Sequence, residues 1–299
     1  MVALVIFLWA LNIVIGKWAL GYIDPLSLAS FRVVLAGLVL FPIFLVRCRN
    51  VRLTPRDRKP VLLMGLLGVA GNQMLFTIGL SQTTSGHSSL VVSSGPVFVL
   101  LIAGLLGMES FTWKKIVGMA VSVCGVAFLA FEHGLDLHNG TLGGDVLTMC
   151  GSFSFAGYVV MGKRVAGHYD PVAMNFFNFV AGGAVVLPLA IWCALHLVFA
   201  AVGWQGWVGL LYMALFASVA AYLIYYWALK YLAASRIAAF SYLLPVMAVV
   251  LGAIFQGERI TGHLIGAGAL ILGGVYLTEL HTSAADEDDE LAEIPTGQA

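Results

Sequence analysis

The sequence is poor in charged residues and in cysteine. Only 10% of its 299 residues are Asp, Glu, Lys or Arg, whereas 61% are hydrophobic. Soluble domains carry about 25% charged residues and disordered chains have low hydrophobicity, so neither class fits. Four cysteines in so long a chain make no disulfide framework, and equal numbers of basic and acidic residues argue against a nucleic-acid binder. The composition predicts a protein whose surroundings are mostly lipid.

Long apolar runs account for most of the chain. A transmembrane helix needs about 20 predominantly apolar residues. Ten such runs, which we number as spans 1 to 10, are Val2–Leu20, Pro25–Val46, Pro60–Leu80, Ser88–Met108, Trp113–Phe131, Gly143–Met161, Pro171–Leu197, Trp207–Leu229, Arg236–Gln256 and Thr261–Leu280. The connections between them are too short for a soluble domain. The sequence therefore predicts an all-α polytopic membrane protein with ten transmembrane helices.

Basic residues gather in alternate connections between the spans. Six of them, including Arg47 and Arg52, lie in the connection after span 2. Twelve of the fifteen lie in connections on the same side as the N-terminus. Because cytoplasmic loops carry the excess of Lys and Arg, we expect both termini in the cytoplasm. Residues 282–299 hold six acidic residues without apolar periodicity, which predicts a disordered cytoplasmic tail.

The two halves of the sequence repeat each other. Gly16-Lys17 and Asp24-Pro25 recur 146 residues later, as Gly162-Lys163 and Asp170-Pro171. Pro96 recurs as Pro245 at a spacing of 149. We expect one repeat over 1–131, an outer connection over 132–142 and a second repeat over 143–281. Each repeat holds five spans, an odd number, so the second must enter the membrane from the opposite side. Such inverted repeats are typical of secondary transporters.

Several short motifs carry a resemblance to a known family. They are Leu8-Trp9-Ala10-Leu11-Asn12, Gly95-Pro96-Val97-Phe98, Gly107-Met108-Glu109, Leu244-Pro245-Val246 and Gly257-Glu258-Arg259. In this order and duplication the chain resembles the EamA-domain transporters of the drug/metabolite transporter superfamily. The resemblance implies a bacterial inner-membrane exporter of amino acids and other small metabolites. It also implies a central cavity lined by spans 1, 3, 4, 6, 8 and 9, with spans 5 and 10 at the periphery.

Candidate cavity residues are the polar, aromatic and proline residues within those spans. Polar side chains are costly in lipid and usually face the bundle interior, and prolines at matching positions of two repeats point to a transport site. The candidates are Trp9, Asn12, Asn72, Gln73, Phe76, Ser94, Pro96, Tyr158, Tyr222, Tyr225, Ser241, Tyr242 and Pro245. Such a cavity is aromatic with few charges. The alternative for any one of these residues is a hydrogen bond to a neighbouring helix.

Arg32 lies about a third of the way into span 2 and is the most deeply placed cation of the chain. It is a candidate charge partner for a substrate carboxylate. The interpretation that we favour from sequence is structural, either a bond to neighbouring carbonyl groups or snorkelling toward the membrane surface.

Groups that catalysis or proton coupling would need are missing from the spans. There is no Gly-x-Ser-x-Gly, His-Glu-x-x-His or Walker motif, and no Asp or Glu stands at the middle of a span. We expect no enzyme activity, no cofactor and no metal site. Three modes of transport stay open: coupling to protons, exchange of one substrate for another, and facilitated export.

The combined prediction is a secondary transporter that exports small amphipathic metabolites, among them hydrophobic or aromatic amino acids, by alternating access. A drug or nucleotide-sugar carrier of the same superfamily is the alternative, and a membrane-embedded enzyme is the competing class. The expected partners are a small-molecule substrate and the lipid bilayer. Gly262 and Gly266 form a GxxxG pair in span 10, so both a monomer and a homodimer through this helix are open.

Overall fold

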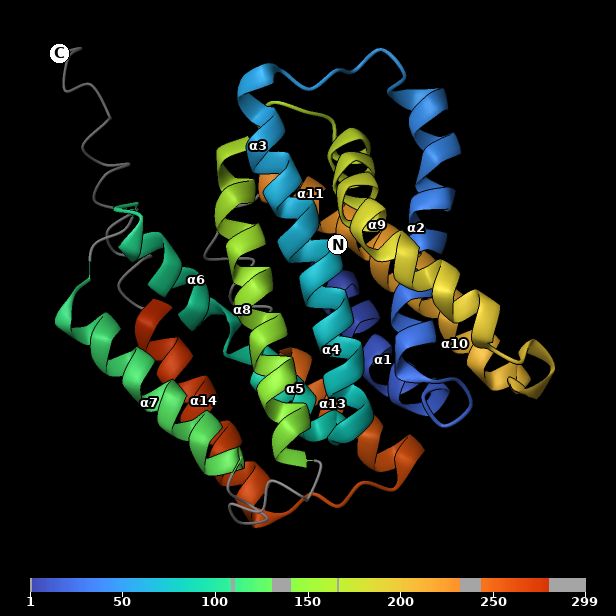
Figure 1. The fold of residues 1–299 in the computed structure, drawn as a ribbon. Helices are drawn as coiled ribbons and strands as arrows, with labels where there is room; N and C mark the ends of the chain where they lie inside the picture. The colour runs from blue at the N-terminus through green and yellow to red at the C-terminus, as the bar shows by residue number, and fades with distance from the viewer. Residues whose placement is uncertain (1, 109–110, 131–140, 166, 232–242, 280–299) are drawn as a thin grey trace, which may run out of the picture.

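The computed structural model describes residues 2–108, 111–130, 141–165, 167–231 and 243–279. Within these ranges all regular secondary structure is helical and no strand occurs (Figure 1). The first half forms α1 (Val2–Ala19), α2 (Pro25–Arg47), α3 (Pro55–Met64), the π-helical segment η1 (Gly65–Gly71), α4 (Asn72–Gln82), α5 (Ser85–Ser93), α6 (Gly95–Leu105) and α7 (Trp113–Ala130). The second half forms α8 (Thr141–Val165), α9 (Pro171–His196), the short turn η2 (Phe199–Ala201), α10 (Trp204–Tyr212), the π-helical segment η3 (Met213–Ala220), α11 (Ala221–Tyr231), α13 (Leu243–Gln256) and α14 (Gly262–Glu279).

Several helical stretches are long and apolar enough to cross a membrane. The six longest are Pro25–Arg47, Pro55–Gln82, Ser85–Leu105, Thr141–Lys163, Pro171–His196 and Trp204–Ala228. Three shorter apolar helices are Ala3–Ala19, Leu243–Gln256 and Gly262–Thr278. The all-helical prediction is confirmed, and these helices agree with a polytopic membrane protein. The count of ten spans and the side of each terminus stay predictions.

The repeated Asp-Pro dipeptide begins a helix in the same way in both halves. Asp24 Oδ1 accepts the backbone N–H of Ser27 at 2.8 Å, and Asp170 Oδ1 accepts that of Val172 at 2.8 Å. The proline after each aspartate occupies the first helical turn, where its missing N–H costs nothing. The two helices, α2 and α9, then pack against each other (Figure 1).

The spans that surround the interior are interrupted. Predicted span 4 breaks at Ser94 into α5 and α6, one residue before Gly95-Pro96. Pro96 cannot donate to the carbonyl oxygen of Val92, four residues back, and the backbone N–H of Ser94 reaches the carbonyl oxygens of Val91 and Val92 instead. Ser94 Oγ donates to the carbonyl oxygen of Val91 as well, at 2.7 Å. Predicted spans 3 and 8 each contain a π-helical segment, η1 and η3, at nearly repeat-related positions. No sequence signal predicted these two segments.

The segment η1 lies very close to α8 and α9, and glycines make this approach feasible. A Cβ atom added at Gly65 would stand 2.6 Å from the Cβ of Ala181 on α9. One added at Gly68 would stand 2.2 Å from the ring of Tyr158 on α8. The sequence Gly65-Leu-Leu-Gly68 therefore fixes how tightly the first repeat packs on the second.

Helices α7 and α14 pack along each other at one edge of the bundle, away from α2 and α9 (Figure 1). Their close contact uses Gly118 and Gly274, since a Cβ at Gly118 would stand 2.7 Å from the carbonyl oxygen of Gly274. By contrast, no atom lies within 4 Å of a Cβ built at Gly262. The second glycine of the GxxxG pair, Gly266, does face α7, since a Cβ there would stand 3.5 Å from the Phe128 ring. The homodimer through this helix stays a prediction.

Candidate functional site

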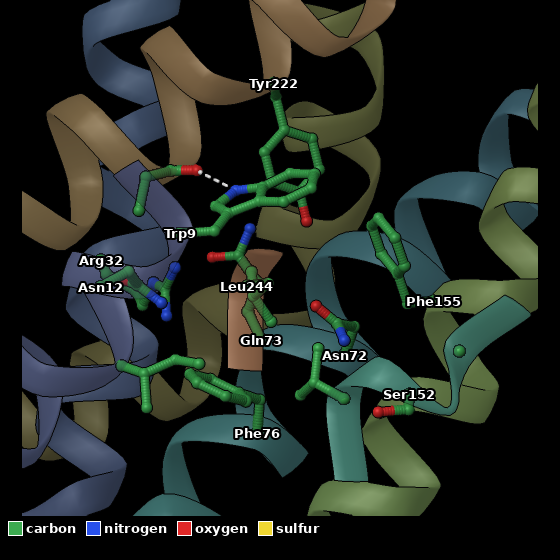
Figure 2. A pocket seen from close by; sticks show the side chains of 14 residues that line it. Trp9, Asn12, Arg32, Asn72, Gln73, Phe76, Ser152, Phe155, Tyr222 and Leu244 are labelled. Atoms are coloured by element: carbon green, nitrogen blue, oxygen red, sulfur yellow. Dashed lines mark hydrogen bonds between the residues drawn. The ribbon is translucent and has the colours of Figure 1, made fainter. Parts of the chain in front are cut away.

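A cavity lies in the interior of the bundle, where helices of both halves meet (Figure 2). The lining surrounds about 660 Å³ of space free of protein atoms, part of which is open to the surroundings. The residues that line it are Trp9, Asn12, Ile13, Arg32, Asn72, Gln73, Phe76, Val92, Gly95, Ser152, Phe155, Ala217, Tyr222 and Leu244. All except Arg32 come from predicted spans 1, 3, 4, 6, 8 and 9.

The structure brings about half of the predicted site residues together around this cavity. Those that line it are Trp9, Asn12, Arg32, Asn72, Gln73, Phe76 and Tyr222. Tyr158 and Tyr225 stand behind the lining, where Tyr225 packs on Trp9 with ring centroids 5.3 Å apart and Tyr158 packs on Phe155 at 5.3 Å. Ser94, Pro96 and Pro245 do not line it. Ser241 and Tyr242 lie outside the described residues.

The lining residues absent from our prediction are mostly apolar or small. They are Ile13, Val92, Gly95, Ser152, Phe155, Ala217 and Leu244. The repeat spacing is the signal that finds some of them. Phe155 follows Trp9 by 146 residues, and Leu244 follows Gly95 by 149. Gln73 and Tyr222, both predicted, are related in the same way. Repeat-related positions therefore meet at the cavity from both halves.

Aromatic rings form one wall of the cavity. The indole of Trp9 meets Phe155 edge-on at a centroid distance of 6.0 Å and Tyr222 at 5.9 Å. Its Nε1 donates a hydrogen bond to the carbonyl oxygen of Ala217 in η3 at 3.3 Å, drawn as a dashed line in Figure 2. This bond joins α1 of the first half to the π-helical segment of the second. The rings offer an apolar surface of defined shape for a flat or bulky group.

Amide and hydroxyl groups supply the hydrogen-bonding part of the lining. Asn72 Nδ2 donates to the carbonyl oxygen of Gly151 at 3.0 Å and so holds α4 to α8. Gln73 Oε1 accepts the hydroxyl of Ser218 at 3.2 Å. Besides Arg32, three lining residues have a buried polar atom with no hydrogen-bond partner among the described residues: Asn12 Oδ1, Gln73 Nε2 and Ser152 Oγ. Open polar atoms in an apolar cavity are the groups that a ligand can engage.

Arg32 is the one charged side chain among the described lining residues. It is 3% exposed, so it does not snorkel to a membrane surface. Its Nη1 donates to Thr77 Oγ1 at 3.4 Å and its Nη2 to Ser218 Oγ at 3.1 Å, whereas Nε has no partner within the described ranges. Arg32 is thus bonded to neighbouring helices, as the structural interpretation expected, but its partners among the described residues are hydroxyl rather than carbonyl oxygens, and its burial excludes snorkelling. Its role as a charge partner for a substrate stays a prediction.

Comparisons with known proteins agree with the architecture. The profile of the EamA-like transporter family matches residues 1–131 and again residues 142–280. A Salmonella typhimurium protein named "Probable amino-acid metabolite efflux pump" is 28% identical over 285 residues, which cover 92% of each chain. An "Uncharacterized transporter" of Archaeoglobus fulgidus is 24% identical over 92% of this chain and 96% of its own length.

One solved structure shares the fold. A crystal structure superposes with a TM-score of 0.64 over 93% of this chain and 98% of the other, at 18% identity. At this identity the likeness shows the fold alone. The family profile covers nearly the whole chain, in two copies, and therefore confirms the resemblance seen in the sequence motifs. The chain belongs to the EamA-like transporter family, within the drug/metabolite transporter superfamily.

Proposed function

We propose that the protein is a secondary transporter that exports small amphipathic metabolites, with hydrophobic or aromatic amino acids as its main substrates. The observation that carries the proposal is the interior cavity, which is built by repeat-related residues from both halves. A site shared by two inverted repeats is the arrangement from which alternating access follows, because rocking one half against the other opens the same site to either side.

The proposed topology has ten spans in two inverted five-helix repeats, with both termini in the cytoplasm of a bacterium. Two separate family matches, over 1–131 and 142–280, support the two repeats. The distribution of Lys and Arg supports the orientation. Residues 282–299 form a cytoplasmic tail in this proposal.

The lining supports an amphipathic substrate. Trp9, Phe155 and Tyr222 offer aromatic surface, whereas Asn12 and Asn72 offer amide groups on the same cavity. A substrate with an apolar side group and a polar end matches both parts. The relative from Salmonella typhimurium, whose name refers to an amino-acid metabolite efflux pump, supports amino acids as the class to test first. A nucleotide-sugar carrier would need more cations than Arg32 for its phosphates.

Flux measurements in reconstituted vesicles test this function. Purified protein in vesicles loaded with a panel of radiolabelled amino acids should release hydrophobic and aromatic members faster than protein-free vesicles do. Asn12→Ala should slow this release about tenfold or more, since it removes a polar group of the cavity. Asn50→Ala, an exposed asparagine outside the cavity, is the matched control and should leave the flux unchanged. If no compound of the panel moves, the proposed function is wrong. If the two variants release the compounds equally fast, the assignment of this cavity as the transport site is wrong.

A further inference from the structure

Arg32 is a buried positive charge that has no opposite charge as a partner in the described part of the chain. The guanidinium is charged at all physiological pH values and carries five N–H donors. Among the described residues it makes two hydrogen bonds, both to neutral hydroxyl groups, and no ion pair. A buried ion costs free energy unless an opposite charge accompanies it. The guanidinium therefore lacks a counter-charge until an anionic group binds to it.

The helices around Arg32 contain no acidic residue that could form an ion pair with it. No Asp or Glu stands between residues 58 and 108, a range that includes α4 and Thr77. None stands between residues 171 and 257, a range that includes η3, Ser218 and Tyr222. The sequence thus excludes an acidic partner from the two elements that hold the guanidinium in place.

The two hydroxyl groups fix the guanidinium rather than neutralise it. Thr77 Oγ1 gives its own proton to the carbonyl oxygen of Gln73 at 2.8 Å. The Ser218 hydroxyl gives its proton to the carbonyl oxygen of Met213 at 2.9 Å or to Gln73 Oε1 at 3.2 Å. Both oxygens therefore face Arg32 with lone pairs, as acceptors. The guanidinium is held at the cavity by bonds that leave its charge unpaired and its Nε open.

Arg32 and the aromatic rings lie on different sides of the cavity. Figure 2 shows Arg32 beside Asn12 on one side, with Phe155 and Ser152 across from them. Trp9 and Tyr222 close a third side. A ligand with an anionic end and an apolar body can place each part against its complement at once.

We infer that Arg32 binds the carboxylate group of the transported substrate. The proposed substrates are then hydrophobic or aromatic carboxylates. Of their two polar groups, binding requires the carboxylate and does not require the amino group. The inference rests on the proposed function, because it assigns the cavity to the transported molecule. No acidic residue that could pair with a substrate ammonium group is found among the lining residues that the structure describes. Asn12 Oδ1 can accept a hydrogen bond from that group, but a neutral amide does not offset a full charge.

Three related compounds separate the two ends of the substrate. Phenylalanine carries both charged groups, 3-phenylpropionate only the carboxylate, and phenethylamine only the ammonium. Binding to the purified full-length protein in detergent is measured as the ligand-dependent rise of its unfolding temperature over a concentration series. We expect phenylalanine and 3-phenylpropionate to bind with similar affinity, and phenethylamine to bind about tenfold or more weakly, the usual effect of losing a charge-assisted bond. Equal binding of phenethylamine and 3-phenylpropionate would overturn the inference.

Variants of Arg32 show whether this residue causes the preference. Arg32→Lys keeps the charge but loses the planar fork, so it should keep the preference for the carboxylate with weaker binding. Arg32→Gln should abolish the preference, so that the three compounds bind alike. Arg47→Gln, an exposed arginine paired with Asp170, is the control and should keep the wild-type ranking. An unchanged ranking in folded Arg32→Gln contradicts the inference. If that variant does not fold, the ligand series on the wild type and on Arg32→Lys decides.

Failure of the inference and failure of the proposed function give different results. If vesicles release phenylalanine and phenethylamine at the same rate, the proposed transport function is supported and the carboxylate-binding role of Arg32 is contradicted. If the detergent-solubilised protein binds 3-phenylpropionate but vesicles release none of the three compounds, the carboxylate site is supported and the transport function is contradicted.

Discussion

Polar residues inside the bundle divide into those whose hydrogen bonds hold one another and those that keep a buried polar atom without a partner among the described residues. Ser218 belongs to the first group, since its hydroxyl accepts from Arg32 and donates to its own π-helical segment or to Gln73. Arg32 belongs to both groups, because two of its nitrogens are bonded and Nε is open. The same side chain is thus positioned by the protein and keeps a donor without a described partner at the cavity that it lines.

This division predicts a coupling between Ser218 and Arg32. Ser218→Ala removes the acceptor of Arg32 Nη2 and should lower the free energy of unfolding by about 1–3 kcal/mol, the cost of a buried donor without a partner. In an Arg32→Met background the same change should cost less, because the donor is gone. Chemical unfolding in detergent of the wild type, the two single variants and the double variant gives the coupling free energy between Ser218 and Arg32. Ser30 is a buried serine on α2 whose hydroxyl donates to the carbonyl oxygen of Ser27, and Ser30→Ala should cost the same in both backgrounds.

Which cavity residues the sequence predicts depends on their cost in lipid. Asn12, Gln73 and Arg32 were found because amides and charges in a span need a reason to be there. Ser152 was missed because a serine hydroxyl can bond its own helix, and many serines in spans therefore carry no signal. Ala217 and Leu244 were missed because an apolar residue that lines a cavity has the same side chain as one that faces lipid.

Interrupted helices surround the cavity, and their irregular segments supply groups to it. The segment η3 provides Ala217, whose carbonyl oxygen holds Trp9, and Ser218, which holds Arg32. The break at Ser94 separates Val92 from Gly95, which both line the cavity. Irregular backbone at membrane depth is tolerated where it is buried in protein or lines a cavity, and π-helical turns are frequent at functional sites.

The close packing of η1 on α8 predicts how a single added methyl group changes the stability of the protein. Gly68→Ala places a Cβ within van der Waals overlap of the Tyr158 ring, so η1 or α8 must move. We expect the free energy of unfolding to fall by about 1–3 kcal/mol, as in other overpacked cores. Gly183→Ala on α9 is the matched control, because no atom lies within 4 Å of its added Cβ, and it should be neutral or stabilising. Equal stability of the two variants would contradict this packing.

Helix boundaries were predicted where the sequence carries a local start signal. Span 2 was expected over Pro25–Val46 and α2 covers Pro25–Arg47, because the Asp24 cap and Pro25 fix its start. Span 3 was expected from Pro60, but its helix begins at Pro55, since a charged first turn lies outside the apolar run that defined the span. The π-helical segments have no comparable signal, because they arise from how neighbouring helices pack.

Two halves of one chain make a single cavity, and this is a property of the whole molecule. Trp9 and Phe155, which the repeat relates, meet at a centroid distance of 6.0 Å. Arg32 of the first half bonds Thr77 of the first half and Ser218 of the second. A carboxylate at this guanidinium therefore sits at the seam between the repeats, where a relative movement of the halves changes its surroundings.

The inverted topology itself can be tested with two positions that the repeat relates. Arg52 follows α2, and Val198, which stands 146 residues later, follows α9. Both are exposed, and neither lines the cavity. If the two repeats enter the membrane from opposite sides, these equivalent positions must lie on opposite faces, with position 52 in the cytoplasm.

Cysteine labelling in whole cells distinguishes the alternatives. Arg52→Cys and Val198→Cys are made separately in a background whose native cysteines, Cys48, Cys124, Cys150 and Cys193, are alanine. A membrane-impermeant thiol reagent should label Val198→Cys in intact cells and Arg52→Cys only after permeabilisation. Labelling of both positions from one side would exclude inverted repeats and with them the proposed mechanism. The reverse pattern would keep the inverted repeats but turn the protein over, so that the twelve basic residues face outward, against the charge rule on which the orientation depends.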